Sequence, residues 1–185
     1  MIDLTGKRFC IFGLQGEGKT ELSKAILRVT PNHLVFDVLG EYAGFNRYKA
    51  DPYADLEDQL SRVIEKWIIG KGLDLVLVDE AHEVCPPKPH PLPAAVRRLC
   101  AYQRHKEAGY GFALGFVAQR PVMINTDLVE LCHYTFLFNL KGKNDLAYLD
   151  AYSAGLGDLV GALEQFQFVV VDQRRQYHVE EPLSL

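Results

Sequence analysis

The stretch GLQGEGKT, residues 13–20, decides the fold of this chain. It follows RFCIFG, residues 8–13, which has the composition of a core β-strand, and it leads into a predicted helix that begins near Lys19. Its spacing is that of the pattern GxxxxGK[ST], in which glycines let backbone N–H groups curve around phosphate oxygens without side-chain clashes. The N-terminus of the following helix adds a positive dipole end and unpaired donors. The stretch therefore predicts a phosphate-binding loop between a strand and a helix.

The residues of this loop have predicted roles in binding Mg-ATP. Lys19 is expected to reach the β- and γ-phosphates and to act in catalysis, and the Thr20 hydroxyl is expected to ligate Mg²⁺. An ordinary glycine-rich turn without a ligand is the alternative, and the strand and helix on either side favour the phosphate site. The predicted nucleotide-binding residues are Gly13, Leu14, Gln15, Gly16, Glu17, Gly18, Lys19, Thr20 and Glu21.

Two adjacent acids end another predicted strand, DLVLVDEA at residues 74–81. Ligands of open α/β sheets bind at the carboxyl ends of the strands, where these acids would lie. Asp79 is therefore the predicted partner of Mg²⁺, directly or through water. Glu80 is the predicted catalytic group that orients and polarises the attacking water. A solvated acidic turn is the alternative for the pair taken alone.

A polar amide ends the next predicted strand, GFALGFVAQ at residues 111–119. Gln119 is predicted to sense the γ-phosphate by hydrogen-bonding it before hydrolysis and releasing it afterwards. The alternative is a glutamine that caps the turn before Pro121. The order of phosphate loop, acid pair and glutamine along the chain favours the sensor.

Apolar strands alternate with helical stretches along the whole chain. This alternation predicts a mostly parallel sheet covered by helices on both faces, and the short polar spacer QRRQ predicts a C-terminal antiparallel β-hairpin. The fold class is therefore α/β, in a single domain at residues 1–185. The strand and helix between the phosphate loop and the acid pair, together with the glutamate directly after aspartate, resemble the RecA-like P-loop NTPases. Beyond those named above, strands are predicted at residues 33–40, 133–140, 166–172 and 177–181, helices at 54–68, 94–106 and 144–154, and an irregular proline-rich segment at 86–93.

The composition is that of a globular protein without a membrane span. Of the 185 residues, 48% are hydrophobic and 24% charged, and no apolar run approaches the roughly 18 residues that a spanning helix needs. The first residues, MIDLTGKRFCIF, break their apolar stretch with charges and lack a small-residue cleavage site, so a signal peptide is not expected. We expect a cytoplasmic protein that does not engage a membrane, in the host cytoplasm or associated with a virion if the chain is viral.

The cysteines form no CxxC pair, and we expect them to be reduced and to serve as small apolar residues. A zinc site at His82, Cys85 and His90 is an alternative. It is disfavoured because no second ligand pair follows at a zinc-finger spacing and prolines surround these residues. The cysteines are Cys10, Cys85, Cys100 and Cys132.

Several motifs together resemble the HerA–FtsK superfamily of DNA-pumping ATPases. They are GLQGEGKT, DVLGEY after the second strand, VDEAHEVCP, YQRHKEAGYGFALGFVAQRP and the closing β-hairpin, and they span residues 7–182. Within the superfamily, the short chain resembles the minimal viral genome-packaging ATPases. We expect none of the N-terminal β-barrel, membrane anchor or DNA-reading winged helix that larger members carry. Sequence-directed loading and membrane attachment are therefore not expected without partners.

The resemblance implies an ATPase that translocates double-stranded DNA as a homo-hexameric ring, with capsid or portal-type proteins as further partners. It also implies an arginine from the neighbouring subunit that completes the ATP site. Arg104, in the block before the strand at residues 111–119, is the first candidate for this catalytic role, with Arg97, Arg98 and Arg120 as alternatives. The net charge of −4 fits a narrow basic lumen better than a broadly basic surface. Candidate lumen residues, each also compatible with a plain surface charge, are Lys141, Lys143, Arg174 and Arg175.

Two other classes of function remain open. A small-molecule P-loop kinase begins with the same loop, but it leaves the acid pair at Asp79 and Glu80 unexplained, and residues 86–93 make a poor lid. A filamentous-phage assembly ATPase related to the zonular occludens toxin also carries a phosphate loop and a strand that ends in acids. Such proteins usually add a membrane span and a further domain.

Overall fold

An eight-stranded sheet organises the computed structural model, which describes residues 2–103 and 111–182, and its strand order is β3-β2-β4-β5-β1-β6-β7-β8. The strands from β3 to β6 in this order run parallel, whereas β7 pairs antiparallel with β6 and with β8. The mostly parallel sheet and the C-terminal hairpin that the sequence predicts are thus confirmed. The strands are β1 (Arg8–Phe12), β2 (His33–Asp37), β3 (Arg47–Lys49), β4 (Leu75–Val78), β5 (Ala113–Ala118), β6 (Tyr134–Phe138), β7 (Phe168–Asp172) and β8 (Tyr177–Glu180).

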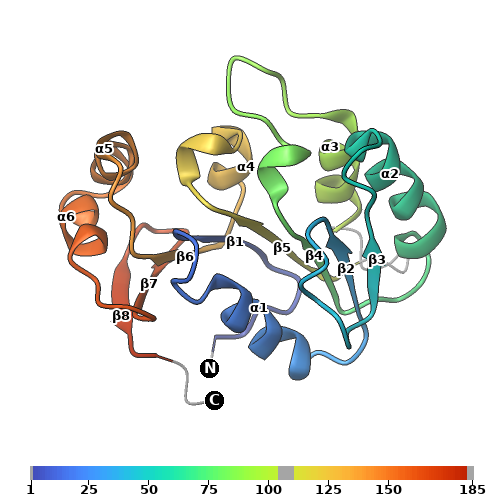
Figure 1. Ribbon diagram of the computed structural model, residues 1–185, viewed down its shortest axis with the longest axis horizontal. Helices are drawn as coiled ribbons and strands as arrows, with labels where there is room; N and C mark the ends of the chain where they lie inside the picture. Colours follow the sequence, from blue (N-terminus) through green and yellow to red (C-terminus); the bar gives the residue numbers. More distant parts are fainter. Residues whose placement is uncertain (1, 104–110, 183–185) are drawn as a thin grey trace.

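Helices cover both faces of the sheet, but unequally (Figure 1). On one face α1 packs through Leu22 and Leu27 onto the central strands, and on the other face the remaining helices form a larger layer. The helices are α1 (Lys19–Arg28), α2 (Leu56–Val63), α3 (Ala94–Tyr102), α4 (Thr126–Glu130), α5 (Lys143–Tyr152) and α6 (Leu156–Gly161). A π-helical turn, η1 (Ile64–Ile68), continues α2, and short 3₁₀ turns lie at η2 (Ala81–Glu83) and η4 (Pro121–Met123).

The second strand ends earlier than predicted, and a short edge strand follows it. The sequence predicts a strand over residues 33–40, but β2 ends at Asp37, whose buried carboxylate accepts hydrogen bonds from the amides of Gly40, Glu41 and Tyr42. The same carboxylate pairs with Arg47 at the start of β3. A strand of only three residues is too short for a periodic signal, so β3 could be found only through this tertiary contact.

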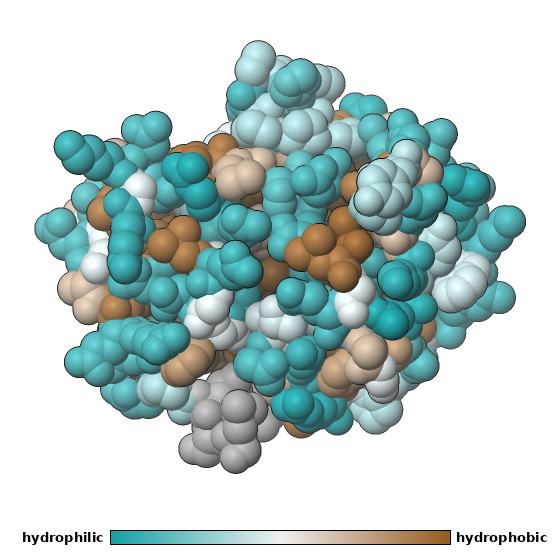
Figure 2. All heavy atoms as spheres, in the orientation of Figure 1, coloured by the Kyte–Doolittle hydropathy of each residue, from teal (hydrophilic) through white to brown (hydrophobic). Residues whose placement is uncertain are grey.

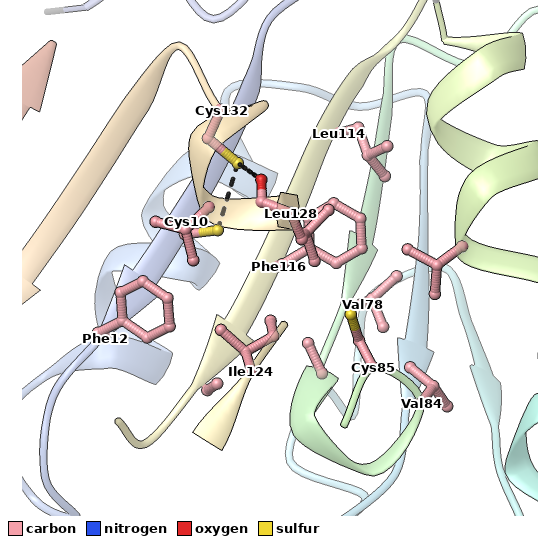
Figure 3. Packing of buried hydrophobic residues seen from close by; sticks show 14 of the residues in the cluster. Cys10, Phe12, Val78, Val84, Cys85, Leu114, Phe116, Ile124, Leu128 and Cys132 are labelled. Carbon is pink, nitrogen blue, oxygen red and sulfur yellow. Dashed lines mark hydrogen bonds between the residues drawn. The ribbon is translucent and has the colours of Figure 1, made fainter. Parts of the chain in front are cut away.

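The central strands are buried on both faces, as their near-continuous apolar sequences require. All four cysteines are buried and free, and they serve as small core residues. The Sγ atoms of Cys10 and Cys132 point toward each other at 3.3 Å, and Cys85 packs beside Val78 and Val84 (Figure 3).

The outer surface carries few large hydrophobic side chains. The face in Figure 2 is mainly hydrophilic, with small separate groups of hydrophobic residues. Across the described residues, no helix has both the length and the apolar character needed to cross a bilayer.

Gly115 in the middle of β5 marks a close approach between neighbouring strands. A Cβ atom there would lie 2.4 Å from Cζ of Phe9 and 2.6 Å from Cδ1 of Leu77. Both neighbours are fully buried, so neither side chain has free space to move into.

We expect Gly115→Ala to lower the free energy of unfolding by about 1–3 kcal/mol, because the added methyl group overpacks the core. Chemical denaturation of the parent and the variant measures this change. Gly161→Ala is the matched control: its Cβ would meet Leu146 at 3.4 Å in a helical backbone, so stability should stay equal or rise slightly. Equal losses in both variants would contradict the packing described for β5.

Candidate functional site

A cavity of about 300 Å³ lies at the carboxyl ends of β1, β4 and β5, beside the N-terminus of α1. It is the place where ligands of open α/β sheets bind. A larger cavity of about 650 Å³ lies near the amino ends of β2, β4 and β5, and its lining is mostly apolar. The smaller cavity gathers the predicted site residues. Its lining consists of Gln15, Gly16, Gly18, Lys19, Thr20, Glu21, Leu39, Glu41, Asp79, Glu80, Val117, Gln119 and Phe166.

The phosphate loop is shaped by glycines and anchored by its first two amides. Gly16 and Gly18 have positive φ angles of 82° and 112°, which side chains rarely tolerate. The amide of Gly13 donates to the carbonyl of Gln119 at 3.2 Å, and the amide of Leu14 donates to the carbonyl of Asn139 at 3.4 Å. These bonds fix the start of the loop to the ends of β5 and β6.

The lining of the cavity divides the predicted nucleotide-binding residues into two groups. Gln15, Gly16, Gly18, Lys19, Thr20 and Glu21 line it. The cavity lining does not include Gly13, Leu14 or Glu17. The amides of Gly13 and Leu14 donate the anchoring hydrogen bonds instead. Roles for all of them in contacting a nucleotide stay predictions.

Lys19 is a nearly buried ammonium group among carboxylates. The residue is 9% exposed, and Nζ donates to the carbonyl of Leu14 at 3.0 Å. Burial lowers the pKa of Lys19, and the nearby charges of Glu80 and Asp79 act in the opposite direction. A buried ammonium group in a phosphate loop is suited to binding a polyanion.

Asp79 is buried at the end of β4 with an unsatisfied oxygen. It is 3% exposed, and its Oδ2 atom has no hydrogen-bond partner in the described structure. Burial raises the pKa of Asp79 from its usual value near 3.8 to about 7, and the negative charges of Glu80, Asp37 and Glu41 add to the shift. A buried carboxylate oxygen without a donor is a suitable ligand for a hard cation or for a water molecule that the cation binds.

Glu80 has the left-handed backbone conformation, with φ 45° and ψ 48°. This conformation costs a non-glycine residue roughly 1–2 kcal/mol, and such strain is concentrated at functional sites. Its Oε2 atom lies 3.2 Å from Nδ1 of His82, although the two are not aligned as a hydrogen bond. Burial raises the pKa of Glu80, while His82 and Lys19 oppose the shift. The strained turn points Glu80 into the cavity beside Asp79 and Lys19.

Glu41 is a further site residue, and no motif in the sequence predicts a role for it. The Thr20 hydroxyl donates to Oε2 of Glu41 at 2.9 Å, and the Asp37 carboxylate holds the amide of Glu41 at 3.1 Å. A hydroxyl whose hydrogen is taken by Glu41 can direct an oxygen lone pair toward a cation. The segment DVLGEY contains Glu41, but only the fold brings it to Thr20.

The oxygen atoms of Thr20 and Asp79 fit Mg²⁺, which prefers hard oxygen ligands and usually binds through one or two carboxylates plus phosphates. The residues proposed for the zinc alternative have other partners. His82 contacts Glu80 and Glu83, and burial raises the pKa of the Cys85 thiol to about 11, which disfavours the thiolate that zinc requires. Within residues 2–103 and 111–182, no three His, Cys, Asp or Glu side chains converge on a possible metal position.

Gln119 lies at the end of β5 and lines the cavity with Lys19, Asp79 and Glu80. Its neighbour Arg120 turns away to form a 2.7 Å ion pair with Asp145, whose side chain is 1% exposed. The adjacent residues Gln119 and Arg120 therefore have different environments: Gln119 lines the cavity, and Arg120 forms a partly exposed ion pair.

The candidate arginines differ in what they contact. Arg104, the first candidate for completing a neighbouring site, lies outside the described residues. Arg98 of α3 pairs at the surface with Glu65 of η1 at 3.0 Å, and Arg97 is exposed on α3. At the hairpin tip, Arg175 contacts Glu130 at 3.3 Å and lies 4.7 Å from the centre of the Tyr152 ring. Arg175 is therefore held against the body of the protein.

Solved structures with the same fold are known, although no protein-family model and no curated protein matches the chain. The genome packaging NTPase B204 from Sulfolobus turreted icosahedral virus 2, in complex with ATP-gammaS, matches with a TM-score of 0.79 at 17% identity, over 98% of this chain and 99% of that one. B204, the DNA-packaging ATPase from Sulfolobus turreted icosahedral virus, matches with a TM-score of 0.71 at 15% identity, over 98% and 100% of the two chains. The N-terminal domain of zonular occludens toxin from Neisseria meningitidis matches with a TM-score of 0.59 at 14% identity, over 97% and 96%.

These likenesses confirm the predicted fold class, a P-loop NTPase fold. At such low identities they establish the fold alone. Membership of the HerA–FtsK superfamily stays a prediction.

The raised pKa of Asp79 generates a prediction for stability. Between its usual pKa near 3.8 and about 7, the carboxyl group is protonated in the folded protein and ionised in the unfolded chain. Stability therefore falls as pH rises through this window. Asp79→Asn removes this titration, so without Mg²⁺ the variant should gain stability over the parent as pH rises, by a total of a few kcal/mol at roughly 1.4 kcal/mol per pH unit.

Urea denaturation at pH 4 and pH 8 measures the difference between the two proteins. The gap should be small at pH 4 and large at pH 8. Parallel pH profiles for parent and variant would show that Asp79 does not titrate abnormally.

Proposed function

We propose that the chain is an Mg-ATPase that translocates double-stranded DNA as a homo-oligomeric ring, as in genome packaging. The observation that carries the ATPase proposal is the meeting of Lys19 and Thr20 with Asp79 and Glu80 at one cavity. A phosphate loop, a metal ligand and a general base are the parts that phosphoryl transfer to water requires. The phosphate loop, the metal ligand and the general base come from β1, α1 and β4 and lie at the same cavity. This arrangement supports ATP hydrolysis in addition to nucleotide binding.

Each side chain has a distinct task in this reaction. The loop amides and Lys19 would hold the phosphates, and Thr20 and Asp79 would hold Mg²⁺, with the Thr20 hydrogen directed to Glu41. When bound, the metal neutralises charge on the phosphate oxygens. Glu80 accepts a proton from the attacking water, and its raised pKa makes it a stronger base than an exposed glutamate. Gln119 donates a hydrogen bond to the γ-phosphate and loses it after hydrolysis.

The ring and the DNA substrate are inferred from the motif resemblance, and the fold match to packaging NTPases supports them. Arg104 remains our first candidate for the arginine that enters the neighbouring site. Arg120 suits that role less well, because it would have to leave its ion pair with the buried Asp145 carboxylate. We propose a hexamer with double-stranded DNA in its lumen, acting in the cytoplasm with capsid or portal-type proteins.

A second candidate function is that of a filamentous-phage assembly ATPase. The fold match to the N-terminal domain of zonular occludens toxin supports it, with a lower TM-score than the B204 matches. Such a protein would hydrolyse ATP without stimulation by DNA and would be recovered with membranes. The small-molecule kinase alternative leaves the strained Glu80 without a role.

Long duplex DNA should stimulate ATP hydrolysis by the parent protein, and the stimulation should weaken with salt because phosphate contacts dominate such binding.

Glu80→Gln should bind ATP with nearly the parent affinity and hydrolyse it about 10²- to 10⁴-fold more slowly, because it loses the general base. A phosphate-release assay with and without DNA, run beside a binding titration, measures both effects.

Glu57→Gln, an exposed glutamate of α2 outside the cavity lining, is the matched control and should keep parent turnover. Parent turnover in Glu80→Gln would remove Glu80 from catalysis. ATPase activity that DNA does not stimulate, in a protein recovered with membranes, would favour the phage-assembly function. Transfer of the γ-phosphate to a small-molecule acceptor would favour a kinase.

A further inference from the structure

One aromatic side chain lines the candidate cavity and has no part in the reaction described above. Phe166 precedes β7, and it is 46% exposed although it is a large hydrophobic residue. An exposed aromatic ring at the wall of a polar cavity presents a flat apolar surface to whatever binds there.

The backbone of Phe166 is strained. Its φ angle is 69°, in the left-handed region that favours glycine. It lies within a turn in which the amide of Gln167 donates to the carbonyl of Glu164 at 3.1 Å, and the amide of Glu164 donates to Oε1 of Gln167 at 3.0 Å. A bulky residue kept where glycine would fit more easily indicates that the ring has a task at this position.

The turn is seated against the phosphate loop. Nε2 of Gln165 donates to the carbonyl of Gly16 at 3.5 Å. A Cβ atom on Gly18 would lie 3.2 Å from Cδ1 of Phe166 and 3.1 Å from Cε1 of Phe138, so the absence of a side chain at Gly18 lets both rings approach. One edge of the Phe166 ring therefore packs at the N-terminus of α1, while nearly half of the residue remains exposed.

Strand order separates Phe166 from the catalytic acids. The sheet runs β4-β5-β1-β6-β7, with the phosphate loop after the central β1. Asp79 and Glu80 follow β4 on one side of the loop, and Phe166 precedes β7 on the other. A nucleotide whose γ-phosphate faces Glu80 therefore extends its other end toward Phe166.

We propose that Phe166 is the stacking platform for the base of the bound nucleotide, and that the site accepts nucleoside triphosphates in preference to inorganic polyphosphate. The proposal rests on the nucleotide site proposed above. Stacking acts on the base alone, so it adds affinity for ATP and none for tripolyphosphate, whose three phosphates fit the same loop.

Phe166→Ala and Phe166→Trp test the proposal, with Mg-ATP and Mg-tripolyphosphate as separate ligands in calorimetric titrations of the full chain. Phe166→Ala should weaken ATP binding about 5- to 150-fold, the range found when aromatic stacking partners of bases are truncated. Its tripolyphosphate affinity should stay within about twofold of the parent value, and Phe166→Trp should retain ATP affinity.

Two further variants separate stacking from folding. Phe166→Gly relieves the positive φ, so it should be more stable to denaturant than Phe166→Ala while losing ATP affinity equally. Tyr53→Ala removes a 98% exposed aromatic residue outside the cavity lining and should change neither ligand's affinity.

Parent-like ATP affinity in Phe166→Ala would overturn the stacking role and leave the nucleotide site intact. An equal loss for ATP and tripolyphosphate would also overturn it, because the residue would then support only the loop. A parent protein that binds neither ligand would overturn the proposed function together with this inference.

Discussion

The structure depends on charge held out of water at one edge of a parallel sheet. Lys19 and Asp79 are nearly buried there, with Glu41 and Glu80 beside them. Burial lowers the pKa of the lysine and raises that of both Asp79 and Glu80, so burial disfavours the charged form of each group. The sheet holds these groups in place because it fixes the strand ends. We propose that bound Mg-ATP supplies the opposite charges that stabilise their ionised forms.

The strand order places different groups on the two sides of the phosphate loop. The central β1 delivers the phosphate loop, and the anchoring bonds from Gly13 and Leu14 tie it to β5 and β6 on either side. Carboxylates lie toward β4, whereas the strained Phe166 lies toward β7. A nucleotide bound across β1 would thus have its reacting end and its base distinguished by the sheet itself.

The sequence predicts those features that are local, and it misses those made by tertiary contact. The phosphate loop, the acids after β4 and Gln119 were predictable because each lies where a hydrophobic strand ends. Three features join segments that are separated in the chain, so no local sequence pattern predicts them. They are the contact of Thr20 with Glu41, the Arg120–Asp145 ion pair, and the seating of the strained Phe166 turn against the phosphate loop. β3 was missed because a strand of three residues is too short to show periodicity.

A crystal structure with Mg²⁺ and a nonhydrolysable ATP analogue tests the central claim most directly. We expect the triphosphate against the amides of residues 15–20, with Nζ of Lys19 moved from the Leu14 carbonyl to phosphate oxygens and the metal beside Thr20 and Asp79. An analogue bound elsewhere, or a cavity that stays closed to it at saturating concentration, would contradict the claim that this sheet edge is a nucleotide site.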